Sequence, residues 1–295
     1  MPHRPLFSLI LCTVDRVAEP LRFVESVVAQ GRQSLELIVV DQNVEDTLEH
    51  QLRRAGRGLP ILYIHRPGQP GLSRARNVAL SVARGKIIAF PDDDCEYPPG
   101  LLDRAAMALA QRNDVHGISC RRVAHCDAVE GNSHAPVRLN RYNVWTRAQS
   151  FTIFLRSELV QRLGGFDPRL GLGSGTPFGS GEETDYLLRA LDVDALLVQL
   201  PDLAVCHPVV DYDAENLAAK GRSYSRGLTY VLDRHRYSWI FVFPIMLWPL
   251  LRALLALFSP RRSRYHWNQF LGRMEAWGLL RRERLDARPR MPSGQ

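Results

Sequence analysis

The stretch Lys86-Ile-Ile-Ala-Phe-Pro-Asp-Asp-Asp94 runs from a short apolar segment straight into three consecutive carboxylates. Its first part, Lys86–Phe90, is typical of a strand that is buried on both faces of a sheet. Adjacent carboxylates repel one another, so a cluster that directly follows a buried strand is unfavourable without a cation. Hard divalent ions bind carboxylate oxygens together with phosphate oxygens. We therefore predict a Mg²⁺ or Mn²⁺ site with Asp92 and Asp94 as ligands; a solvated acidic turn is the alternative.

Strand-like and helix-like runs alternate on both sides of this stretch. We expect strands at Phe7–Cys12, Leu35–Val40, Ile61–Ile64, Phe151–Leu155, Ala195–Leu200 and Leu203–Cys206, and helices at Leu21–Ala29, Asp46–Arg54, Ser73–Ala83 and Pro98–Gln111. The alternation predicts an α/β fold with a doubly wound, mostly parallel sheet. Ligands of such sheets bind beyond the carboxyl ends of the strands. Asp15 and Asp41 follow two expected strands, so we expect them at the edge that carries the triplet, although Asp is also a common turn and cap residue.

A second acidic cluster, Glu182-Glu183-Thr184-Asp185, follows the glycine-rich segment Gly171–Gly181. A flexible loop of this kind can close over a substrate, and a carboxylate at the start of a helix is well placed to act as a general base. The alternative is that these acids only complement the positive end of the helix dipole.

The chain is basic, with a formal net charge of +7. A basic balance favours nucleic acid, an anionic membrane or anionic substrates. No zinc finger, aromatic RNA-binding pattern or basic zipper occurs in the sequence, so we expect no nucleic-acid partner. The five cysteines form no C-x-x-C pair, which together with their odd number predicts reduced thiols in a cytoplasmic chain. The short polar start Met1–Pro5 is not typical of a signal peptide.

The segment Ser238–Phe258 is almost wholly apolar and is flanked by arginines. Pro244, Pro249 and Arg252 interrupt it, and an arginine deep in a bilayer is unfavourable. Aromatic residues near both ends suit the membrane–water interface. We expect this segment to lie in, or dip into, the cytoplasmic leaflet. A full span, a buried helix and an oligomer contact are the alternatives.

Six segments in order carry a resemblance to a known family. These are Ser8-Leu-Ile-Leu-Cys-Thr-Val-Asp-Arg16, Val39-Val-Asp41, Gly71-Leu-Ser-Arg-Ala-Arg-Asn77, Phe90-Pro-Asp-Asp-Asp94, Gly164-Gly-Phe-Asp167 and Gly181-Glu-Glu-Thr-Asp185. Together they resemble the family 2 glycosyltransferases, which have the GT-A fold. The similarity covers roughly Phe7 to Pro208, and we expect a catalytic domain over 1–215 and a helical, membrane-associated segment over 216–295.

The resemblance implies a metal-dependent, inverting transferase of the hexosyltransferase type, which moves a sugar from a nucleotide-diphosphate donor to an acceptor hydroxyl. The acceptor would be a sugar or a lipid-linked group in cell-surface polysaccharide or glycolipid assembly. The implied contacts to the donor are Thr13, Asp15, Asp41, Arg74, Asn77, Asp92 and Asp93, and His207 stands where some relatives carry a further metal ligand. Glu183 fills the position of the family's base, usually Asp, and Glu182 is the second candidate.

Other functions fit less well. A haloacid-dehalogenase-type phosphatase would have Thr or Val where Glu96 stands, and a nucleotidyltransferase would have a glycine-rich loop in Thr13–Glu19. No P-loop and no G-x-S-x-G motif occurs. A membrane-tethered, catalytically inactive nucleotide-sugar binding protein remains the alternative from a different class.

Overall fold

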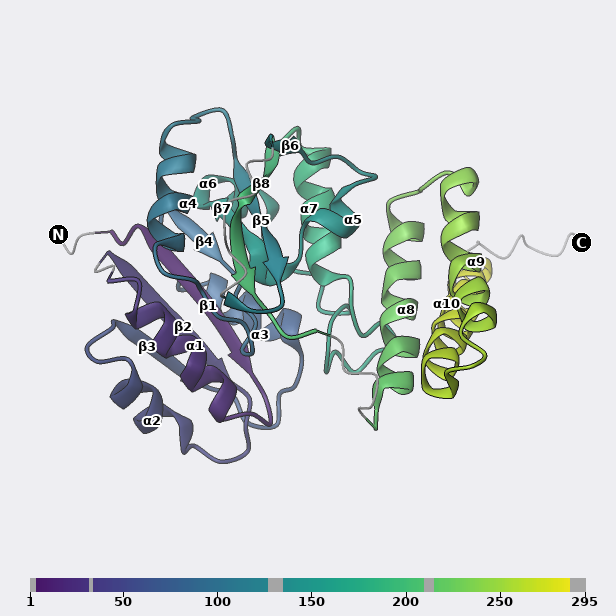
Figure 1. The fold of residues 1–295 in the computed structure, drawn as a ribbon, viewed down its shortest axis with the longest axis horizontal. Coiled ribbons are helices and arrows are strands. Elements are labelled where there is room, and N and C mark those ends of the chain that lie inside the picture. Colours follow the sequence, from purple (N-terminus) through teal and green to yellow (C-terminus); the bar gives the residue numbers. More distant parts are fainter. Residues whose placement is uncertain (1–3, 32–33, 127–134, 210–214, 287–295) are drawn as a thin grey trace, which may run out of the picture. The chain divides into compact units, whose positions relative to one another are not determined.

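The computed structural model describes residues 4–31, 34–126, 135–209 and 215–286 (Figure 1). The elements are β1 (Phe7–Thr13), α1 (Ala18–Val28), β2 (Leu35–Asp41), α2 (Leu48–Ala55), β3 (Ile61–His65), α3 (Leu72–Leu80), β4 (Ile87–Ala89), α4 (Leu101–Ala110), β5 (Gly117–Val123), β6 (Val137–Arg138), α5 (Val144–Arg147), β7 (Ile153–Arg156), α6 (Ser157–Leu163), α7 (Glu182–Asp192), β8 (Leu197–Cys206), α8 (Leu217–Arg234), α9 (Trp239–Leu255) and α10 (Pro260–Asp286).

A single sheet organises the N-terminal part, with strand order β3-β2-β1-β4-β7-β5-β8-β6. Strands β3, β2, β1 and β4 pair in parallel, as do β5 and β8, whereas β7 and β6 run antiparallel to their neighbours. The predicted α/β, mostly parallel sheet is therefore confirmed. The register of the parallel strands brings their carboxyl ends to one edge, where Thr13 lies beside Asp41.

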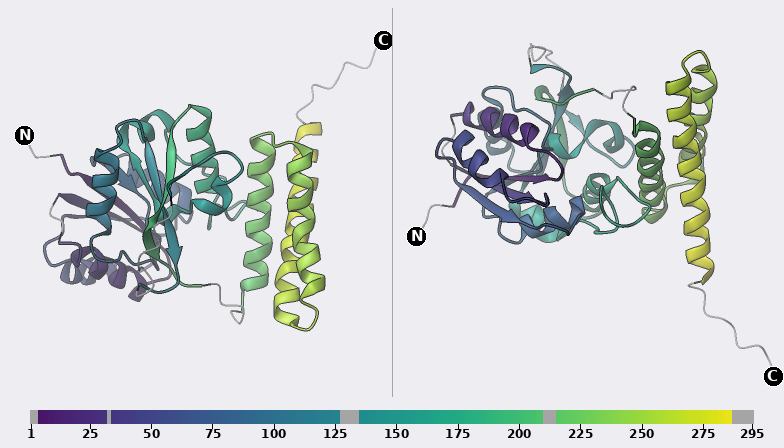
Figure 2. Two further views of the ribbon diagram at one scale, coloured as in Figure 1. Left: turned by 45° about the horizontal axis from the view of Figure 1, so that its top comes forward. Right: turned by 90° about the horizontal axis from the view of Figure 1, so that it is seen from below.

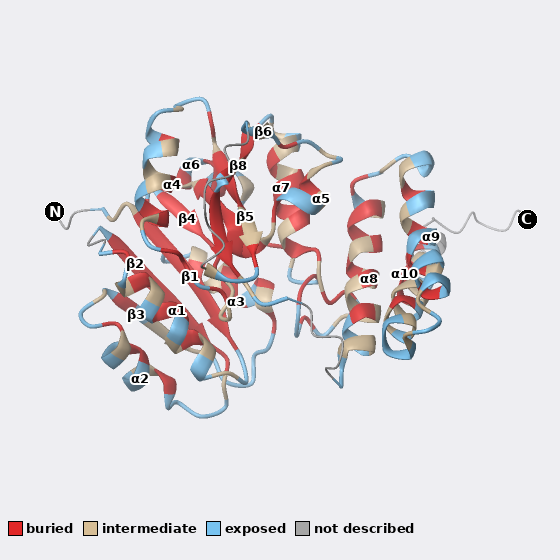
Figure 3. Cartoon of the chain, in the orientation of Figure 1, coloured by how far each residue is buried: buried red, intermediate tan, exposed pale blue. Residues whose placement is uncertain are grey.

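Helices cover both faces of this sheet. On one face, α1, α2 and α4 pack against side chains of β1 and β2 such as Leu9 and Leu37, which are fully buried. Figure 3 shows the central strands of the sheet in the colour of buried residues. Side chains alternate between the faces of a strand, so Ile10 and Ile38 belong to the opposite face. Both of these are also fully buried, and α3 contacts β1 and β2. Burial on both faces explains why the strands read as continuous apolar runs.

A buried polar network ties the amino ends of β1, β2 and β4 together. Ser8 Oγ donates to Glu36 Oε1 at 2.6 Å and accepts from the Gly85 N–H at 2.7 Å. Arg84 donates its N–H and its guanidinium to the same Glu36 carboxylate. Gly85 has no room for a side chain, because a Cβ there would lie 2.3 Å from the Ser8 nitrogen. The network therefore fixes how the chain enters β4 and the carboxylates beyond it.

Two expected elements differ in the structure. The predicted strands Ala195–Leu200 and Leu203–Cys206 form one strand, β8, which continues through Pro201. A register shift against β5 between Cys120 and Arg121 absorbs the irregularity. The predicted strand Phe151–Leu155 begins instead as a 3₁₀ turn, Ser150–Thr152, and only then becomes β7.

The chain divides into two compact units. The first contains Met1–Pro168 and Glu183–Val209, and the second contains Arg169–Glu182 and Val210–Gln295. In the second unit α8, α9 and α10 pack side by side (Figure 2). The glycine-rich segment thus belongs with the C-terminal helices.

Helix α9 continues through both of its prolines. Pro249 has no N–H to offer the Ile245 carbonyl one turn earlier. Arg273 of α10 donates a guanidinium N–H to that carbonyl, and burial lowers the pKa of Arg273 to about 10. Within the described residues, no helix combines the length and the apolar character needed to cross a bilayer.

Replacing Ser8 tests the network at the start of the sheet. Ser8→Ala should lower the free energy of unfolding by about 1–3 kcal/mol, because the buried Gly85 N–H loses its acceptor. Urea denaturation of both proteins measures the change in the free energy of unfolding. Ser81→Ala, an exposed serine at the end of α3, is the control. A change no larger than that of the control would mean that the network does not stabilise the sheet.

Candidate active site

The Asp92–Asp94 triplet follows β4 at the edge where the parallel strands end. Ala89 pairs with Leu9, so the same register carried four residues further sets Asp93 beside Thr13. Thr13 Oγ1 indeed donates to Asp93 Oδ2 at 2.7 Å. The strand pairing thus explains why residues so distant in sequence meet.

Asp92 faces the other side of the triplet. Its Oδ1 accepts from Ser150 Oγ at 2.9 Å and from the Arg76 guanidinium at 3.2 Å. Arg76 is 1 % exposed, and its guanidinium lies 5.4 Å from the centre of the Phe166 ring. A buried cation beside Asp92 offsets part of the repulsion within the triplet.

Arg16 pairs with the other two carboxylates. Its NH1 lies 2.5 Å from Asp93 Oδ1 and 2.9 Å from Asp94 Oδ2. Burial raises the pKa of Asp93 to about 6, against the opposing effects of Thr13 and Arg16. Burial would also raise the pKa of Asp94, but His207 and Arg16 outweigh it and lower that pKa. The neighbouring carboxylates therefore have pKa values on opposite sides of their usual range.

His207 completes the cluster from the end of β8. Its Nε2 lies 3.2 Å from Asp94 Oδ1 and 3.8 Å from Asp92 Oδ2. Its ring stacks on Phe151 with 4.3 Å between ring centres. Burial lowers the pKa of His207, but the hydrogen bond and charge of Asp94 raise it more, so the net shift is upward.

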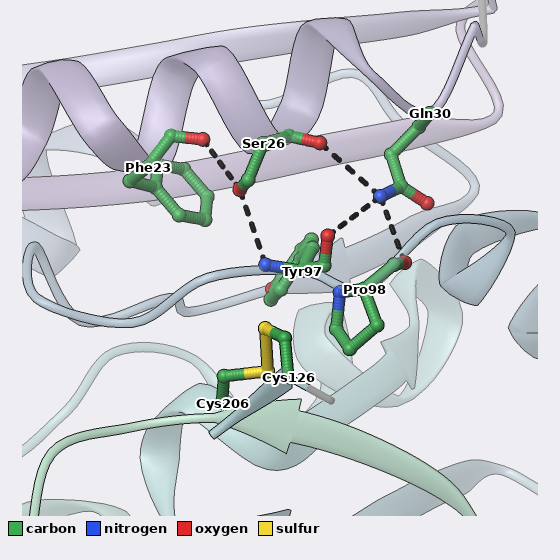
Figure 4. Close-up of a disulfide and its surroundings, with 7 residues drawn as sticks. All are labelled: Phe23, Ser26, Gln30, Tyr97, Pro98, Cys126 and Cys206. Atoms are coloured by element: carbon green, nitrogen blue, oxygen red, sulfur yellow. Dashed lines mark hydrogen bonds between the residues drawn. A yellow bond between two sulfur atoms is a disulfide. The ribbon is translucent and has the colours of Figure 1, made fainter. Parts of the chain in front are cut away.

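The backbone around His207 is braced from both sides. The His207 N–H donates to the Val123 carbonyl at 2.9 Å, and Glu96 and Cys206 exchange two backbone hydrogen bonds. The chain after the triplet is held in turn by Gln30, two residues past the end of α1, which donates to the carbonyls of Tyr97 and Pro98 (Figure 4). Asp94 and His207 are thus held at a fixed spacing by their own main chains.

A disulfide joins Cys126 and Cys206 (Figure 4). The expectation that all five cysteines are reduced is therefore wrong, because the ends of β5 and β8 bring these two sulfurs together. No sequence signal marked the pair, since the residues are separated by 80 positions. Cys12, Cys95 and Cys120 are buried free thiols, and burial raises their pKa values. A raised pKa makes these three thiols unreactive.

The residues present fit a divalent cation. Asp92, Asp94 and His207 each offer one ligand atom, and these atoms lie within 4.8 Å of one another. Two carboxylates and an imidazole suit Mn²⁺, whereas Mg²⁺ prefers an all-oxygen set. The three residues that the sequence marked as ligands are therefore brought together, while Asp93 turns toward Thr13 and Arg16.

Two of the predicted donor contacts on α3 have other neighbours. Arg74 is exposed and donates to the Pro70 carbonyl, and it is Arg76 that reaches the triplet. Asn77 pairs both ends of its amide with the backbone of Phe166. Gly165 lets it approach, because a Cβ there would lie 2.8 Å from Asn77 Oδ1. Asn77 thus holds the G-G-F-D turn in place.

Asp15 and Asp41 lie at the same edge and share one neighbour, Asn43. The fully buried Asp41 accepts from the Asn43 N–H at 2.8 Å and from the Tyr63 hydroxyl at 2.5 Å. Asn43 in turn accepts from the Asp15 N–H, and Asp15 itself is exposed at a positive φ of 56°. Sequence reasoning missed Asn43, Ser150 and the roles of Arg16 and Arg76, although both arginines stand inside quoted motifs.

Glu182 and Glu183 begin α7, as expected. Glu182 is 5 % exposed and Glu183 is half-buried. Asp185, one turn further, is fully buried and pairs with Arg189 at 3.0 Å. Asp185 is therefore tied to Arg189 within its own helix.

The sequence matches the family described as glycosyl transferase family 2 over residues 8–160, more than half of the chain. The chain belongs to glycosyl transferase family 2. The matched residues include the Asp92–Asp94 triplet and its partners Thr13 and Arg76, whereas His207 and the acids at the start of α7 lie outside the match.

Curated relatives agree with the assignment. The chain is 33 % identical over 118 residues to the putative colanic acid biosynthesis glycosyl transferase WcaA of Escherichia coli, a match that covers 39 % of this chain and 40 % of that protein. It is 24 % identical over 283 residues to the glycosyltransferase AglE of Haloferax volcanii, which covers 88 % of this chain and 84 % of AglE.

Solved structures confirm the GT-A fold. The mannosyltransferase PcManGT of Pyrobaculum calidifontis, in complex with GDP-Man and Mn²⁺, superposes with a TM-score of 0.62 at 18 % identity over 97 % of this chain and 81 % of that one. Residues 1–349 of TarS from S. aureus, in complex with UDP, give a TM-score of 0.54 at 17 % identity over 98 % and 95 % of the two chains.

The pH dependence of Mn²⁺ binding should report His207. A metal ligand must be deprotonated, so with its raised pKa His207 should make Mn²⁺ affinity fall about tenfold per pH unit below that pKa. Isothermal titration calorimetry between roughly pH 9 and pH 6.5, the ordinary pKa of histidine, measures this while staying above the pKa of Asp93. His207→Gln should bind more weakly but with a flat profile, and Asp94→Ala should bind at no pH. A flat profile in the unmodified protein would contradict the ligand assignment.

Proposed function

We propose that this glycosyltransferase transfers a hexose from a nucleotide-diphosphate donor to an acceptor hydroxyl, with inversion at the anomeric carbon. The observation that supports it most strongly is the cluster of Asp92, Asp94 and His207 at the carboxyl edge of the sheet. Ligands of parallel sheets bind at this edge.

The donor would lie across the ends of β1, β2 and β4. Thr13, Asp15 and Asp41 line this edge, and Arg16 and Arg76 supply positive charge beside the triplet. We assign Mn²⁺ as the preferred ion because of the imidazole ligand. When bound to the three ligands, the ion would supply positive charge that stabilises the departing diphosphate.

The base must come from elsewhere in the site. The acceptor hydroxyl loses its proton as its oxygen bonds to the anomeric carbon and the bond from that carbon to the diphosphate breaks. Asp94, with its lowered pKa, is a poor proton acceptor. Glu183 is our first choice for the base, with Glu182 orienting the loop or the acceptor. Both candidate positions carry a carboxylate, and no observation favours a catalytically inactive binding protein.

Glu183→Gln tests the base. The amide keeps the shape of the side chain but cannot accept the proton, so turnover should fall by about 10²–10⁴-fold while Mn²⁺-dependent GDP or UDP affinity stays unchanged. Steady-state kinetics with the first acceptor found in a screen of alkyl glycosides and polyprenyl-phosphate-linked sugars measures it. Glu158→Gln, an exposed position on α6, is the control.

The role would move to Glu182 if Glu182→Gln lost turnover and Glu183→Gln did not. Near-normal turnover in both variants would remove the base from α7.

We also propose that α9 docks on the cytoplasmic face of a membrane. One run of its side chains is exposed, including Ile240 at 86 %, Leu255 at 74 % and Phe258, just past the helix, fully exposed. Arg252, Arg261 and Arg262 are exposed beside this run. Apolar side chains with basic neighbours suit an anionic leaflet, and a lipid-linked acceptor would be reached from there.

Vesicle binding tests the docking face. The double variant Leu255→Glu/Phe258→Glu should bind phosphatidylglycerol-containing vesicles roughly a hundredfold more weakly. Two apolar side chains that become buried in the bilayer contribute about 3 kcal/mol or more to binding. Co-sedimentation measures it, with Val44→Glu as the control, since Val44 is equally apolar and exposed but lies in the first unit. Equal binding by both variants would exclude α9 as the docking face.

The compartment needs its own experiment. Basic flanks favour the cytoplasmic leaflet. The Cys126–Cys206 disulfide weighs against a reducing compartment, since such bonds are rare there. Thiols are trapped with an alkylating reagent in intact cells, and Cys126 and Cys206 are then mapped. Alkylated cysteines would indicate the reducing cytoplasm, and a disulfide would indicate an oxidising compartment.

A further inference from the structure

The loop Arg169–Glu182 leads directly into the acids at the start of α7, yet it belongs to the unit of the C-terminal helices. It has its own internal order: Thr176 Oγ1 donates to the Arg169 carbonyl at 2.6 Å, and the Gly171 N–H donates to the Phe178 carbonyl at 3.1 Å. Because the loop is grouped with the C-terminal helices, its contacts with those helices determine its position.

The backbone of α8 touches the backbone of this loop at Gly227. A Cβ at Gly227 would lie 2.1 Å from the Ser180 carbonyl oxygen and 2.8 Å from the Ser180 nitrogen. Backbone atoms cannot move aside as a side chain does. The Gly179 N–H donates to the Ser223 carbonyl, and Ser180 Oγ donates to the Tyr224 carbonyl at 2.9 Å. Only glycine allows this approach at position 227.

Arg226 links the loop to a second helix. Its Nε donates to the Pro177 carbonyl at 2.9 Å, and its NH1 donates to Glu275 of α10 at 3.1 Å. Glu275 also accepts from Arg222, which lies one turn earlier on α8. The Phe178 ring packs on Tyr230 with 4.6 Å between ring centres. The loop is therefore held by a chain of contacts from Pro177 through α8 to α10.

We propose that Arg226 and Gly227 are positioning residues that set the loop 169–182, and through it the start of α7, for the acceptor. This rests on the proposed base at the start of α7. The C-terminal helices then take part in transfer as well as in docking, because they hold the segment that presents the acceptor-side acids. Loosening the loop should harm transfer to an acceptor more than hydrolysis of the donor by water, which needs no acceptor to be aligned.

Matched pairs of variants test the proposal. Gly227→Ala is compared with Gly278→Ala, a glycine of α10 whose added Cβ would meet nothing within 4 Å. Arg226→Met is compared with Arg222→Met, which loses the same partner Glu275 but no loop contact. Three quantities are measured for each variant. These are the hydrogen–deuterium exchange rates of the loop amides, the affinity for GDP with Mn²⁺ by calorimetry, and the ratio of transfer to hydrolysis with GDP-mannose and UDP-glucose.

Gly227→Ala and Arg226→Met should speed exchange at the Gly179 amide and lower the ratio of transfer to hydrolysis about 10- to 100-fold, the effect of a misplacement of about 1 Å. GDP affinity and exchange in β1 and β2 should stay at the control values. If Gly227→Ala does not fold, Arg226→Met decides.

The proposal is overturned if the loop amides of both variants exchange as slowly as in the controls. It is also overturned if the loop amides exchange faster but the ratio of transfer to hydrolysis stays unchanged. A uniform loss of transfer, hydrolysis and GDP binding would mean a merely structural role and would also overturn it. A failure of the proposed base is seen separately, as normal transfer in Glu183→Gln and Glu182→Gln with the loop exchange unaffected.

Discussion

The mutual repulsion of three consecutive carboxylates is the constraint on which the site depends. The structure resolves it by turning each side chain toward a different partner. Asp92 meets the buried Arg76 and Ser150, Asp93 meets Thr13 and Arg16, and Asp94 meets Arg16 and His207. Arg16 and Arg76 thus pair with all three acids between them. Asp92 and Asp94 also lie near His207, close enough together for the three side chains to hold a divalent ion.

That arrangement needs His207 to be held as firmly as the triplet. The β8 strand brings it to the edge, and the hydrogen bonds of its own N–H and of Cys206 tie it to β5 and to the segment after the triplet. Tyr97 and Pro98 are in turn held by Ser26 of α1 and by Gln30 just after it. The Cys126–Cys206 disulfide adds a covalent link one residue before His207. The cluster of Asp92, Asp94 and His207 is therefore a product of backbone pairing, which holds the side chains at their spacing whether or not they attract one another.

The second unit, with α8, α9 and α10, is held together mainly by close helix packing. Its inner contacts are close backbone approaches at glycines: Gly272 of α10 lies against the Arg222 backbone, and Gly227 of α8 lies against Ser180. Its outer surface keeps large apolar side chains exposed. The glycine contacts explain how the helices pack on one another. Globular proteins rarely leave such a run of apolar side chains exposed, so this run is a candidate interaction surface.

The sequence by itself determined the sheet class, the strand before the triplet and the family, because these follow from local apolar runs and from residues adjacent in the chain. It also predicted Asp92 and Asp94 as metal ligands, and the structure places them close enough together to hold an ion. It also marked His207, though only through resemblance. Tertiary structure alone decided that Arg76 and not Arg74 reaches the triplet, since the two differ only in which side of α3 they occupy. It likewise decided the Cys126–Cys206 pair and the grouping of the loop 169–182 with α8. Such contacts join residues far apart in sequence, and no local pattern records which of several candidates the folded chain brings within bonding distance.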